Sequence, residues 1–388
     1  MVETKFKKTD IGIIPEDWEV DKLGEFSFIT KLAGFEYSKY FNSYKDGGDI
    51  IVVRGTNITH NRLDLTDVKF IPQKTSDFLQ RSKLSKGDLV FAYVGTIGPI
   101  YKIEDNNRFH LGPNTAKIRI EKDNVSTSYI YNYFLSEFIR KEIEDRISVG
   151  AQPSLSMSKI RDFSIPLPPL PEQKAIAEVL SDTDSWIESL ENLIAKKRLI
   201  KQGAMQTLLT PKEDWGVKKL GDRSIIYTGK KNNQDKSENG KYPFFVRSQT
   251  VEKINSYSFN GEAILIPGEG NLGSIVHYIN GKFDFHQRVY KISDFVGLHG
   301  KYLYFYFRMY FGNHAMQNTV KATVDSIRLP TLEEFIIKFP SLSEQERIAT
   351  ILSDMDAEIE GLEQKLAKSK QIKQGLMQEL LTGRIRLV

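Results

Sequence analysis

The sequence predicts a mixed α/β (α+β) fold with a pseudo-two-fold internal repeat, in which two globular domains are joined by a long antiparallel two-helix coiled coil. The first observation is a stretch that occurs twice. Residues 168–210 and 340–382 align without a gap at an offset of 172, and 25 of the 43 positions are identical, which indicates an internal duplication. The second is a Glu-Asp-Trp signature, followed in both copies by Lys-Leu-Gly, before each globular segment. The third is a series of short strand-like runs with glycine punctuation between each signature and the repeated stretch.

Each copy of the repeated stretch is expected to form one helix of about 60 Å, since about 40 residues rise 1.5 Å each. Apolar residues recur at spacings of four and three, which is the pattern of a coiled-coil seam. The seam positions are Ile176, Leu180, Thr183, Ile187, Leu190 and Ile194 in the first copy, and Ile348, Leu352, Met355, Ile359, Leu362 and Leu366 in the second. Ser343, three residues before Glu346, has the spacing of a capping box, and Pro211 and Gly383 follow the two helix ends.

The seam is interrupted at the same place in both copies. Lys201 and Lys373 stand where an apolar residue is due, and Gly203 and Gly375 follow, although glycine inside a helix costs about 1 kcal/mol relative to alanine. Two interpretations remain open: a tolerated stutter, or a fixed point at which another helix approaches closely. Because the apolar pattern resumes afterwards, we expect each helix to continue through its glycine.

The two globules share an outline of strands followed by an aromatic helix. Strands are expected at 50–54, 87–91, 115–120 and 163–166 in the first globule, and at 244–247, 261–265, 288–292 and 335–338 in the second. Helices rich in aromatic residues are expected at 128–143 and 301–316. They could be taken for base-stacking platforms, but their recurrence at the same place in both globules favours a buried face.

Domain boundaries follow from this order. The predicted segments are a first domain at 1–167, a first spacer helix at 168–211, a second domain at 212–339 and a second spacer helix at 340–388. If the second helix packs on the first through the seam, it must run back along it. The globules are then expected at opposite ends of the pair, and the C-terminus beside the N-terminal Glu-Asp-Trp signature.

Composition limits the class of protein. The 388 residues are 40% apolar, enough for two or three domains with cores of their own, and include no cysteine, which suits a reducing cytoplasm. The N-terminus lacks the apolar core of a signal peptide, and no apolar run reaches membrane-spanning length; we therefore expect a cytoplasmic location. The net charge of +4 is uneven, with +6 on residues 215–338 and −2 and −1 on the helical segments 161–214 and 339–388. Basic surface is therefore expected on the globules.

These features resemble a known family, the specificity (S) subunits of type I restriction–modification systems. The resemblance rests on the repeated helix with its PEQ and KQGAMQ elements, the IPEDWEV opening, the run Arg54-Gly-Thr-Asn-Ile58 and the passage GAQPSLSMSKIRDFSIPLPP at residues 150–169. It covers essentially the whole chain. The second copy of that passage, at residues 320–340, lacks the Gly-Gln-Pro run.

The resemblance implies a division of labour. Each globule would be a target recognition domain that reads one half of a bipartite double-stranded DNA site, and the helices would be a spacer that fixes the distance between the halves. The spacer would also dock two adenine-N6 methyltransferase (M) subunits, which restriction (R) subunits can join. The S subunit itself would catalyse nothing and carry no cofactor.

The sequence lacks the motifs of the chemistry itself. An adenine methyltransferase needs an Asn- or Asp-Pro-Pro-aromatic loop, whereas Pro168-Pro169 has leucine on both sides. Residues 95–98 and 270–273 are glycine turns rather than G-x-G-x-x-G, and no Walker motif occurs. Glu172-Gln-Lys174 and Glu363-Gln-Lys365 imitate a nuclease fragment, but both are expected on solvated helix faces. The six histidines show no metal-ligand spacing, so no metal site is expected.

DNA contacts are expected from loop residues beside the strands, because Arg, Asn and Gln distinguish bases while other cations meet phosphates. The candidates in the first globule are Lys31, Tyr37, Arg54, Thr56, Asn57, Arg108, Asn114 and Gln152. Those in the second are Lys230, Lys231, Asn232, Asn233, Arg247, Gln249, Gln287, Arg288 and Lys321.

Partner contacts are expected from apolar helix residues that a two-helix seam leaves unassigned: Trp186, Leu193, Leu199 and Ile372. The principal alternative function is a helical scaffold or adaptor without sequence-specific DNA reading. A self-contained DNA-modifying enzyme with an unfamiliar site is the second alternative.

Overall fold

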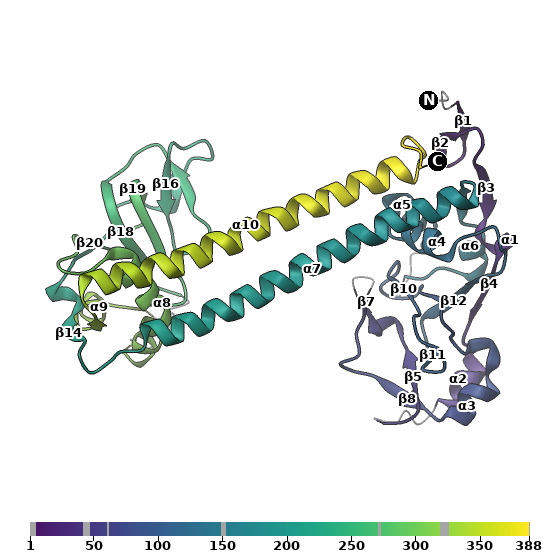
Figure 1. Cartoon of the computed structure of the whole chain (residues 1–388), viewed down its shortest axis with the longest axis horizontal. Coiled ribbons are helices and arrows are strands. Elements are labelled where there is room, and N and C mark those ends of the chain that lie inside the picture. Colours follow the sequence, from purple (N-terminus) through teal and green to yellow (C-terminus); the bar gives the residue numbers. More distant parts are fainter. Residues whose placement is uncertain are drawn as a thin grey trace. The chain divides into compact units, whose positions relative to one another are not determined.

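The computed structural model describes residues 5–41, 47–59, 62–148, 153–270, 273–318 and 326–387. The chain divides into two compact units. Unit 1 comprises Met1–Ser189 and Leu366–Val388, and unit 2 comprises Leu190–Lys365. The two long helices, α7 (Leu170–Leu209) and α10 (Leu342–Leu380), each give one segment to each unit (Figure 1). They confirm both predicted helices, including their continuation through Gly203 and Gly375.

Unit 1 is built on two small sheets (Figure 1). The first is antiparallel and has the order β10 (Ile100–Lys102), β9 (Leu89–Ala92), β12 (Thr115–Ile120), β4 (Ser27–Lys31). In the second, β5 (Ile50–Val53) pairs in parallel with β11 (Phe109–Leu111) and antiparallel with β8 (Lys69–Ile71). Every residue of β5 and β9 is buried, which explains why these two strands read as continuous apolar runs rather than alternating ones.

Unit 2 repeats this topology in one sheet. The order is β15 (Ile225–Thr228), β20 (Val289–Ser293), β18 (Phe259–Pro267), β19 (His277–Phe285), β16 (Tyr242–Phe245), β17 (Glu252–Ile254). The first four strands are antiparallel, and β16 pairs in parallel with β19, as β5 does with β11. The long strand β19 joins both halves of the sheet. In unit 1 its counterpart is split into β10 and β11 by residues 103–108, where Asn107 adopts φ 56°, and so the strands that form one sheet in unit 2 are divided between two sheets in unit 1.

The strand that follows each Glu-Asp-Trp signature pairs with the strand that leads into the long helix. In unit 1, β3 (Glu19–Lys22) pairs antiparallel with β13 (Ser164–Leu167); in unit 2, β14 (Gly216–Lys219) pairs in the same way with β21 (Ile336–Phe339). The remaining elements are β1 (Phe6–Thr9), β2 (Gly12–Pro15), α1 (Leu23–Phe26), α2 (Gly34–Tyr40), β6 (Ile58–Thr59), β7 (Arg62–Leu63), α3 (Gln73–Phe78), α6 (Met157–Arg161), α9 (Leu329–Glu333) and the 3-10 turns Gly55–Asn57, Gln80–Ser82, Leu220–Asp222 and Asn233–Asp235.

The aromatic helices form core in both units, as predicted. Tyr129 and Tyr302 are fully buried, and their hydroxyl groups donate to the carbonyls of Pro166 and Lys338, each at 2.8 Å. The second helix is continuous, α8 (Gly300–Gln317). The expectation of a single helix at 128–143 is wrong, because unit 1 has α4 (Thr127–Phe134) and α5 (Glu137–Arg146). Ser136 breaks the helix: its backbone is extended (φ −84°, ψ 161°), and its hydroxyl donates to the carbonyl of Tyr133 at 2.6 Å.

A glutamine near the start of each long helix ties that helix to the aromatic helix. The side chain of Gln173 accepts from the backbone N–H of Ser126 at 2.8 Å, and donates to the carbonyl of Pro168 at 2.8 Å. In unit 2, Gln345 accepts from the N–H of His299 at 2.9 Å and donates in the same way to a proline carbonyl. Ser126 and His299 are the N-caps of α4 and α8. The repeated glutamine is therefore a structural signature of each helix start.

Eight of the twelve predicted seam residues are buried, and the other four, Thr183, Met355, Leu362 and Leu366, are half-buried. Ile176, Leu180, Ile187, Leu190, Ile194, Ile348, Leu352 and Ile359 are all at most 8% exposed. The predicted cap at Ser343 is wrong, because α10 already begins at Leu342 and it is Ser341 whose hydroxyl accepts from the N–H of Glu344, at 3.4 Å.

The two lysines that interrupt the seam reach across to the other helix. Nζ of Lys373 lies 2.6 Å from Oδ1 of Asp184 in unit 1, and Lys201 makes the corresponding ion pair with Asp356 in unit 2. Each member of one pair lies 172 residues from its counterpart, so the duplicated sequence forms the same contact twice. In unit 1, Asp184 of α7 pairs with Lys373 of α10, and Trp186, two residues later on α7, bonds to Ser369, four residues earlier on α10. The two segments therefore run antiparallel.

The C-terminal residues bind the N-terminal signature, as predicted. Arg386 donates to Asp17 through Nη1 at 3.0 Å and Nη2 at 2.7 Å, and to Glu172 through Nε at 2.7 Å and Nη2 at 2.8 Å. Glu172 also accepts from Nε1 of Trp18 at 3.1 Å. The expectation that Glu172 lies on a solvated face is wrong, because its side chain is 0% exposed. Helix periodicity does not reveal this contact, since its partners lie 154 residues before it and 214 residues after it.

Candidate nucleic-acid interface

In unit 1 the loops that follow three strands meet at one edge of the fold. The N–H of Gly112, after β11, donates to the carbonyl of Val53 in β5 at 2.8 Å, and the N–H of Tyr93, after β9, donates to the carbonyl of Asn114 at 3.1 Å. The N–H of Leu155 in turn donates to the carbonyl of Tyr93 at 3.0 Å. We call residues 54–57, 93–99, 112–114 and 153–155 the loop edge of unit 1.

Unit 2 has the same edge, held by the same backbone bonds. The N–H of His286 donates to the carbonyl of Phe245 at 2.9 Å, that of Gly268 to the carbonyl of Arg288 at 2.8 Å, and that of Ile327 to the carbonyl of Gly268 at 2.8 Å. We call residues 246–249, 268–270, 286–288 and 326–328 the loop edge of unit 2. The segment after β15 joins it, because the N–H of Gln287 donates to the carbonyl of Lys231 at 2.8 Å.

The structure brings part of the predicted unit 1 residues to the loop edge. Thr56 and Asn114 are exposed there, and Lys31 ends β4 opposite Ala116, near the start of β12. Beside this edge lies a hollow of about 730 Å³ lined by Thr56, Thr96 and Gly98 and by residues of α5 such as Arg140.

Other predicted residues of unit 1 have partners within the protein. Asn57 is 3% exposed, and its side chain accepts from Arg54 and donates to the carbonyls of Asp64 and Asp67. Arg54 also pairs with the Asp67 carboxylate at 3.0 Å. Tyr37 is on α2, outside the four loop-edge segments. Arg108 precedes β11, at the strand end opposite the edge, and pairs with Asp105 at 2.7 Å. Gln152 lies outside the described residues.

The predicted residues of unit 2 gather more closely. Seven of them are exposed, and Lys231 is half-buried; these eight are Lys230, Lys231, Asn232, Asn233, Arg247, Gln249, Gln287 and Arg288. Two hollows of about 480 Å³ each open at the loop edge, one lined by Asn233, Lys236 and Arg247, and the other by Gln287, Arg288 and Arg328. Lys321 lies outside the described residues.

Sequence reasoning missed Glu269, which lines both hollows. Its carboxylate binds Arg247 at 3.1 Å and Arg288 at 2.6 Å. His286 lies close to both arginines. Burial lowers the pKa of His286, and the positive charges of Arg247 and Arg288 lower it further. The glycines on either side of Glu269 were the available signal, since Gly270 adopts φ 92° in a tight turn.

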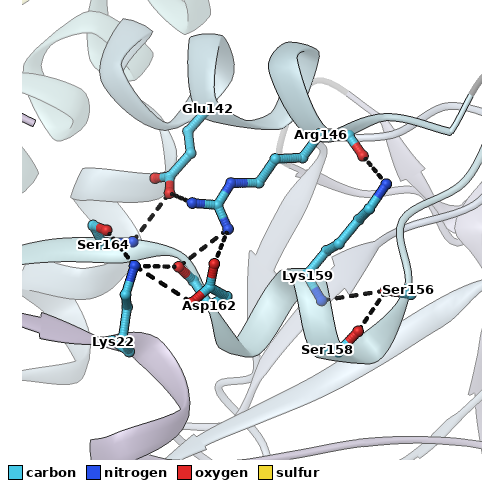
Figure 2. Close-up of polar contacts among 8 residues, drawn as sticks. All are labelled: Lys22, Glu142, Arg146, Ser156, Ser158, Lys159, Asp162 and Ser164. Atoms are coloured by element: carbon cyan, nitrogen blue, oxygen red, sulfur yellow. Dashed lines mark hydrogen bonds and ion pairs between the residues drawn. The ribbon is translucent and has the colours of Figure 1, made fainter. Parts of the chain in front are cut away.

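The passage that precedes α7 forms a polar network in unit 1 (Figure 2). The carboxylate of Glu142 accepts from Arg146 at 2.6 Å and from the N–H of Ser164 at 3.1 Å, and Arg146 also donates to Asp162 at 2.8 Å. Lys22 joins Asp162 at 3.4 Å. Burial raises the pKa of Glu142. These charges fix α5, α6 and β13 to one another and thereby place the 153–155 segment at the loop edge.

Two buried lysines lie at equivalent places in the sheets. Lys117 of β12 and Lys291 of β20 are each followed by isoleucine, and they are 1% and 0% exposed. Burial lowers the pKa of both lysines to about 8. Lys117 donates to the carbonyl of Lys83 at 2.9 Å, and Nζ of Lys291 lies 3.5 Å from the ring centroid of Phe259.

The predicted partner residues are exposed apolar groups on the long helices. Trp186 is 45%, Leu193 38%, Leu199 69% and Ile372 50% exposed; Nε1 of Trp186 donates to the hydroxyl of Ser369 at 3.2 Å. Ile200, the repeat equivalent of Ile372, is 47% exposed and was not predicted. A Cβ added at Gly203 or Gly375 would meet no atom within 4 Å. Among the residues that the structure describes, no contact therefore accounts for either glycine.

The described residues also bear on other classes of protein. Each helix among them is too short or too polar to span a lipid bilayer. In the same part of the chain, no group of three or more His, Cys, Asp or Glu side chains is arranged to hold a metal ion.

The chain is thus a protein of two repeated domains with equivalent loop edges, and comparison with known families identifies the class to which it belongs. The model of the type I restriction modification DNA specificity domain matches residues 15–197 and again residues 212–373. The chain belongs to this family, which confirms the resemblance seen in the sequence.

Individual relatives support the assignment along the whole chain. A Methanocaldococcus jannaschii protein described as the MjaX type I restriction enzyme specificity subunit is 27% identical over 99% of this chain and 97% of its own length. The Escherichia coli EcoDI specificity subunit is 33% identical over 44% of this chain and 37% of its own. The crystal structure of a type I restriction-modification S subunit from M. genitalium has a TM-score of 0.63 at 16% identity and covers 97% of this chain and 98% of that one; this likeness shows a shared fold.

Proposed function

We propose that this chain is the DNA sequence-recognition subunit of a type I restriction–modification complex. Residues 1–167 and 212–339 act as target recognition domains, each reading one half of a bipartite site. The helices at 168–211 and 340–388 act as the spacer and dock two adenine-N6 methyltransferase subunits. R subunits join where the system includes them. The chain itself is non-catalytic, and the chemistry belongs to its partners.

The observation that carries the proposal is the loop edge, present twice on the same backbone framework with different side chains. Asn114 of unit 1 corresponds to Arg288 of unit 2. The backbone carbonyl of each accepts a hydrogen bond from the N–H that follows the equivalent strand, that of Tyr93 in unit 1 and that of Gly268 in unit 2. Groups that distinguish bases thus differ between the units while the framework is constant. This is the pattern expected of two readers with unlike half-sites, and it favours DNA reading over a scaffold without sequence preference.

Docking of methyltransferase subunits is supported by the exposed apolar residues on α7. Trp186, Leu193 and Ile200 follow one another at intervals of seven, which places them on one face of the helix. The corresponding residues of α10 are Glu358, Lys365 and Ile372. The apolar face therefore belongs mainly to α7.

A genome-wide map of N6-methyladenine tests the proposal. It is recorded in cells that carry the methyltransferase partner, with and without this chain. The expected result is one split motif, with two unlike halves and a fixed unread gap, methylated only when the chain is present. If a complex forms and the map does not change, the chain is an assembly adaptor and the proposal fails. Methyl transfer from S-adenosylmethionine by the purified chain alone would contradict its non-catalytic role.

A further inference from the structure

Glu269 occupies a central place in the loop edge of unit 2. It follows β18, and the exposed fraction of its side chain is 22%, whereas those of Arg247 and Arg288 are 44% and 59%. One carboxylate oxygen binds Nη1 of Arg247 at 3.1 Å, and the other binds Nη1 of Arg288 at 2.6 Å. The carboxylate therefore lies below two guanidinium groups that reach further into solvent.

Each guanidinium keeps donors available. Within the described residues, Nε and Nη2 of Arg247 and of Arg288 make no hydrogen bond. An arginine in this state can present a planar pair of N–H groups while a carboxylate holds its other side. Such a pair matches O6 and N7 of guanine in the major groove, which is the commonest specific arginine contact with DNA.

The backbone of Arg288 is also fixed. Its N–H donates to Nδ1 of His286 at 2.9 Å, and Nε2 of His286 lies 3.0 Å from Oδ1 of Asn232. His286 is 2% exposed. Arg288 is thus held at its backbone by a buried histidine and at its side chain by Glu269, which reduces the rotamer freedom that a long side chain loses on binding.

Unit 1 has nothing of this kind at the corresponding positions. Val94 bridges to Ser154 as Glu269 bridges to Ser326, so valine stands in place of the carboxylate. Asn114 stands in place of Arg288 and Gly55 in place of Arg247. All three members of the cluster are therefore specific to unit 2, where the carboxylate of Glu269 joins the two arginines.

We propose that Glu269 is a positioning residue for base readout. It holds Arg247 and Arg288 so that their remaining donors meet guanine edges in the half-site read by the second recognition domain. This inference rests on the proposed function and adds a residue and a base class to it. Without Glu269 the arginines still supply positive charge, but their side chains are free to turn to phosphates, which carry no sequence information.

The test is the base preference of the assembled complex at each position of the motif. Complexes of the full chain with its methyltransferase partner are compared for wild type, E269A, E269Q, R247A, R288A and E269A/R288A. The readout is the methylated fraction for every base at every position, from single-molecule sequencing. E334A is the matched control, because Glu334 is in the same unit and forms an exposed ion pair with Lys219 at 2.6 Å.

E269A is expected to lower the preference for guanine at one or two positions of one half-site by about tenfold or more. The same positions should relax in R247A or R288A, and E269A/R288A should relax no further at the position set by Arg288. E269Q should give a smaller change, and E334A none. The other half-site should stay intact in every variant, which also shows that each complex folds and assembles.

Two outcomes would overturn the inference: an unchanged motif in E269A, or relaxation at a position that neither arginine variant affects, which would mean that Glu269 itself contacts a base. Both outcomes presuppose that the wild-type complex methylates a bipartite motif. If the wild type methylates no such motif, the proposed function fails first, and the two failures are thereby distinguished.

Discussion

Arg386 holds the fully buried carboxylate of Glu172 through two parallel hydrogen bonds, Nε to Oε1 at 2.7 Å and Nη2 to Oε2 at 2.8 Å. The two residues lie 214 positions apart. The contact joins the end of the chain to the start of α7, and Asp17 of the Trp signature binds the same guanidinium. The two carboxylates raise the pKa of Arg386.

The first prediction concerns this contact. R386M leaves Glu172 buried without its cationic partner, so the free energy of unfolding should fall by about 3 kcal/mol. Urea unfolding followed by circular dichroism measures the change. R384M is the control, because Arg384 is exposed and its ion pair with Glu379 is long, at 3.5 Å. This substitution should change the free energy of unfolding by less than about 0.5 kcal/mol. Adding E172Q to R386M should recover part of the loss; a double variant no more stable than R386M would contradict the account.

The second prediction concerns the cross-helix ion pairs. K373E places a second carboxylate opposite that of Asp184. The repulsion should lower the free energy of unfolding by about 1–2 kcal/mol. The exchanged pair D184K/K373E restores opposite charges and should recover most of the loss. Thermal unfolding of K373E, D184K and D184K/K373E gives the coupling. K368E, at an exposed position on the same helix, serves as the control, and equal effects of K368E and K373E would show that net charge rather than the pair is responsible.

The third prediction decides between the two interpretations of the helix glycines. G203A and G375A meet open space, so each should stabilise the isolated chain by up to about 1 kcal/mol through helix propensity. If a partner helix approaches there, the same methyl group should weaken assembly with the methyltransferase subunits. Thermal melts of the chain and titration of the complex measure the two effects. Stabilisation together with unchanged assembly would favour the tolerated stutter instead.

The fourth prediction concerns the exposed face of α7. W186E/L193K gives α7 the residues that α10 carries at the corresponding positions, Glu358 and Lys365. The loss of the Trp186 bond to Ser369 should cost only about 1 kcal/mol, so the chain should remain folded while assembly with methyltransferase subunits is lost. Size-exclusion chromatography with light scattering checks assembly. A complex that survives this change would place the docking surface elsewhere.

The fifth prediction is a pH dependence from the buried lysines. The pKa of Lys117 is about 8 in the folded protein, against about 10.4 for an unfolded lysine. Between these values the unfolded chain binds more protons, so the wild type gains stability as pH rises and loses it as pH falls towards 8. Relative to K117M, the wild type should gain on the order of 2–3 kcal/mol between pH 8 and pH 10.5.

Urea melts at several pH values check the lysine prediction, and K122M, which removes an exposed lysine, is the control. Lys291 has the same folded pKa of about 8, so K291M should behave like K117M. A difference between wild type and K117M that does not vary with pH would show that Lys117 titrates normally in the folded chain.

Local pattern was sufficient where neighbours along one element decide the outcome. The spacing of Ile176 and Leu180 predicted a buried seam, and the recurrence of aromatic residues around Tyr129 and Tyr302 predicted core. It was insufficient at Ser136, where a side chain hydrogen-bonds to its own backbone and ends a helix that the apolar pattern would continue. It was also insufficient at Glu172, whose environment comes from residues distant in the sequence.

The duplication, the two long helices, the alternation of globule and helix, and the family could all be predicted from the sequence, because they are expressed in periodicity and in spacing along the chain. Three contacts became visible only in the folded chain: Arg386 binds Glu172, Lys201 and Lys373 pair across the helices, and Glu269 lies between Arg247 and Arg288. Each of these contacts joins residues that are neighbours only after strands and helices have packed. Pairings of this kind depend on three-dimensional distance, which no single-sequence period encodes.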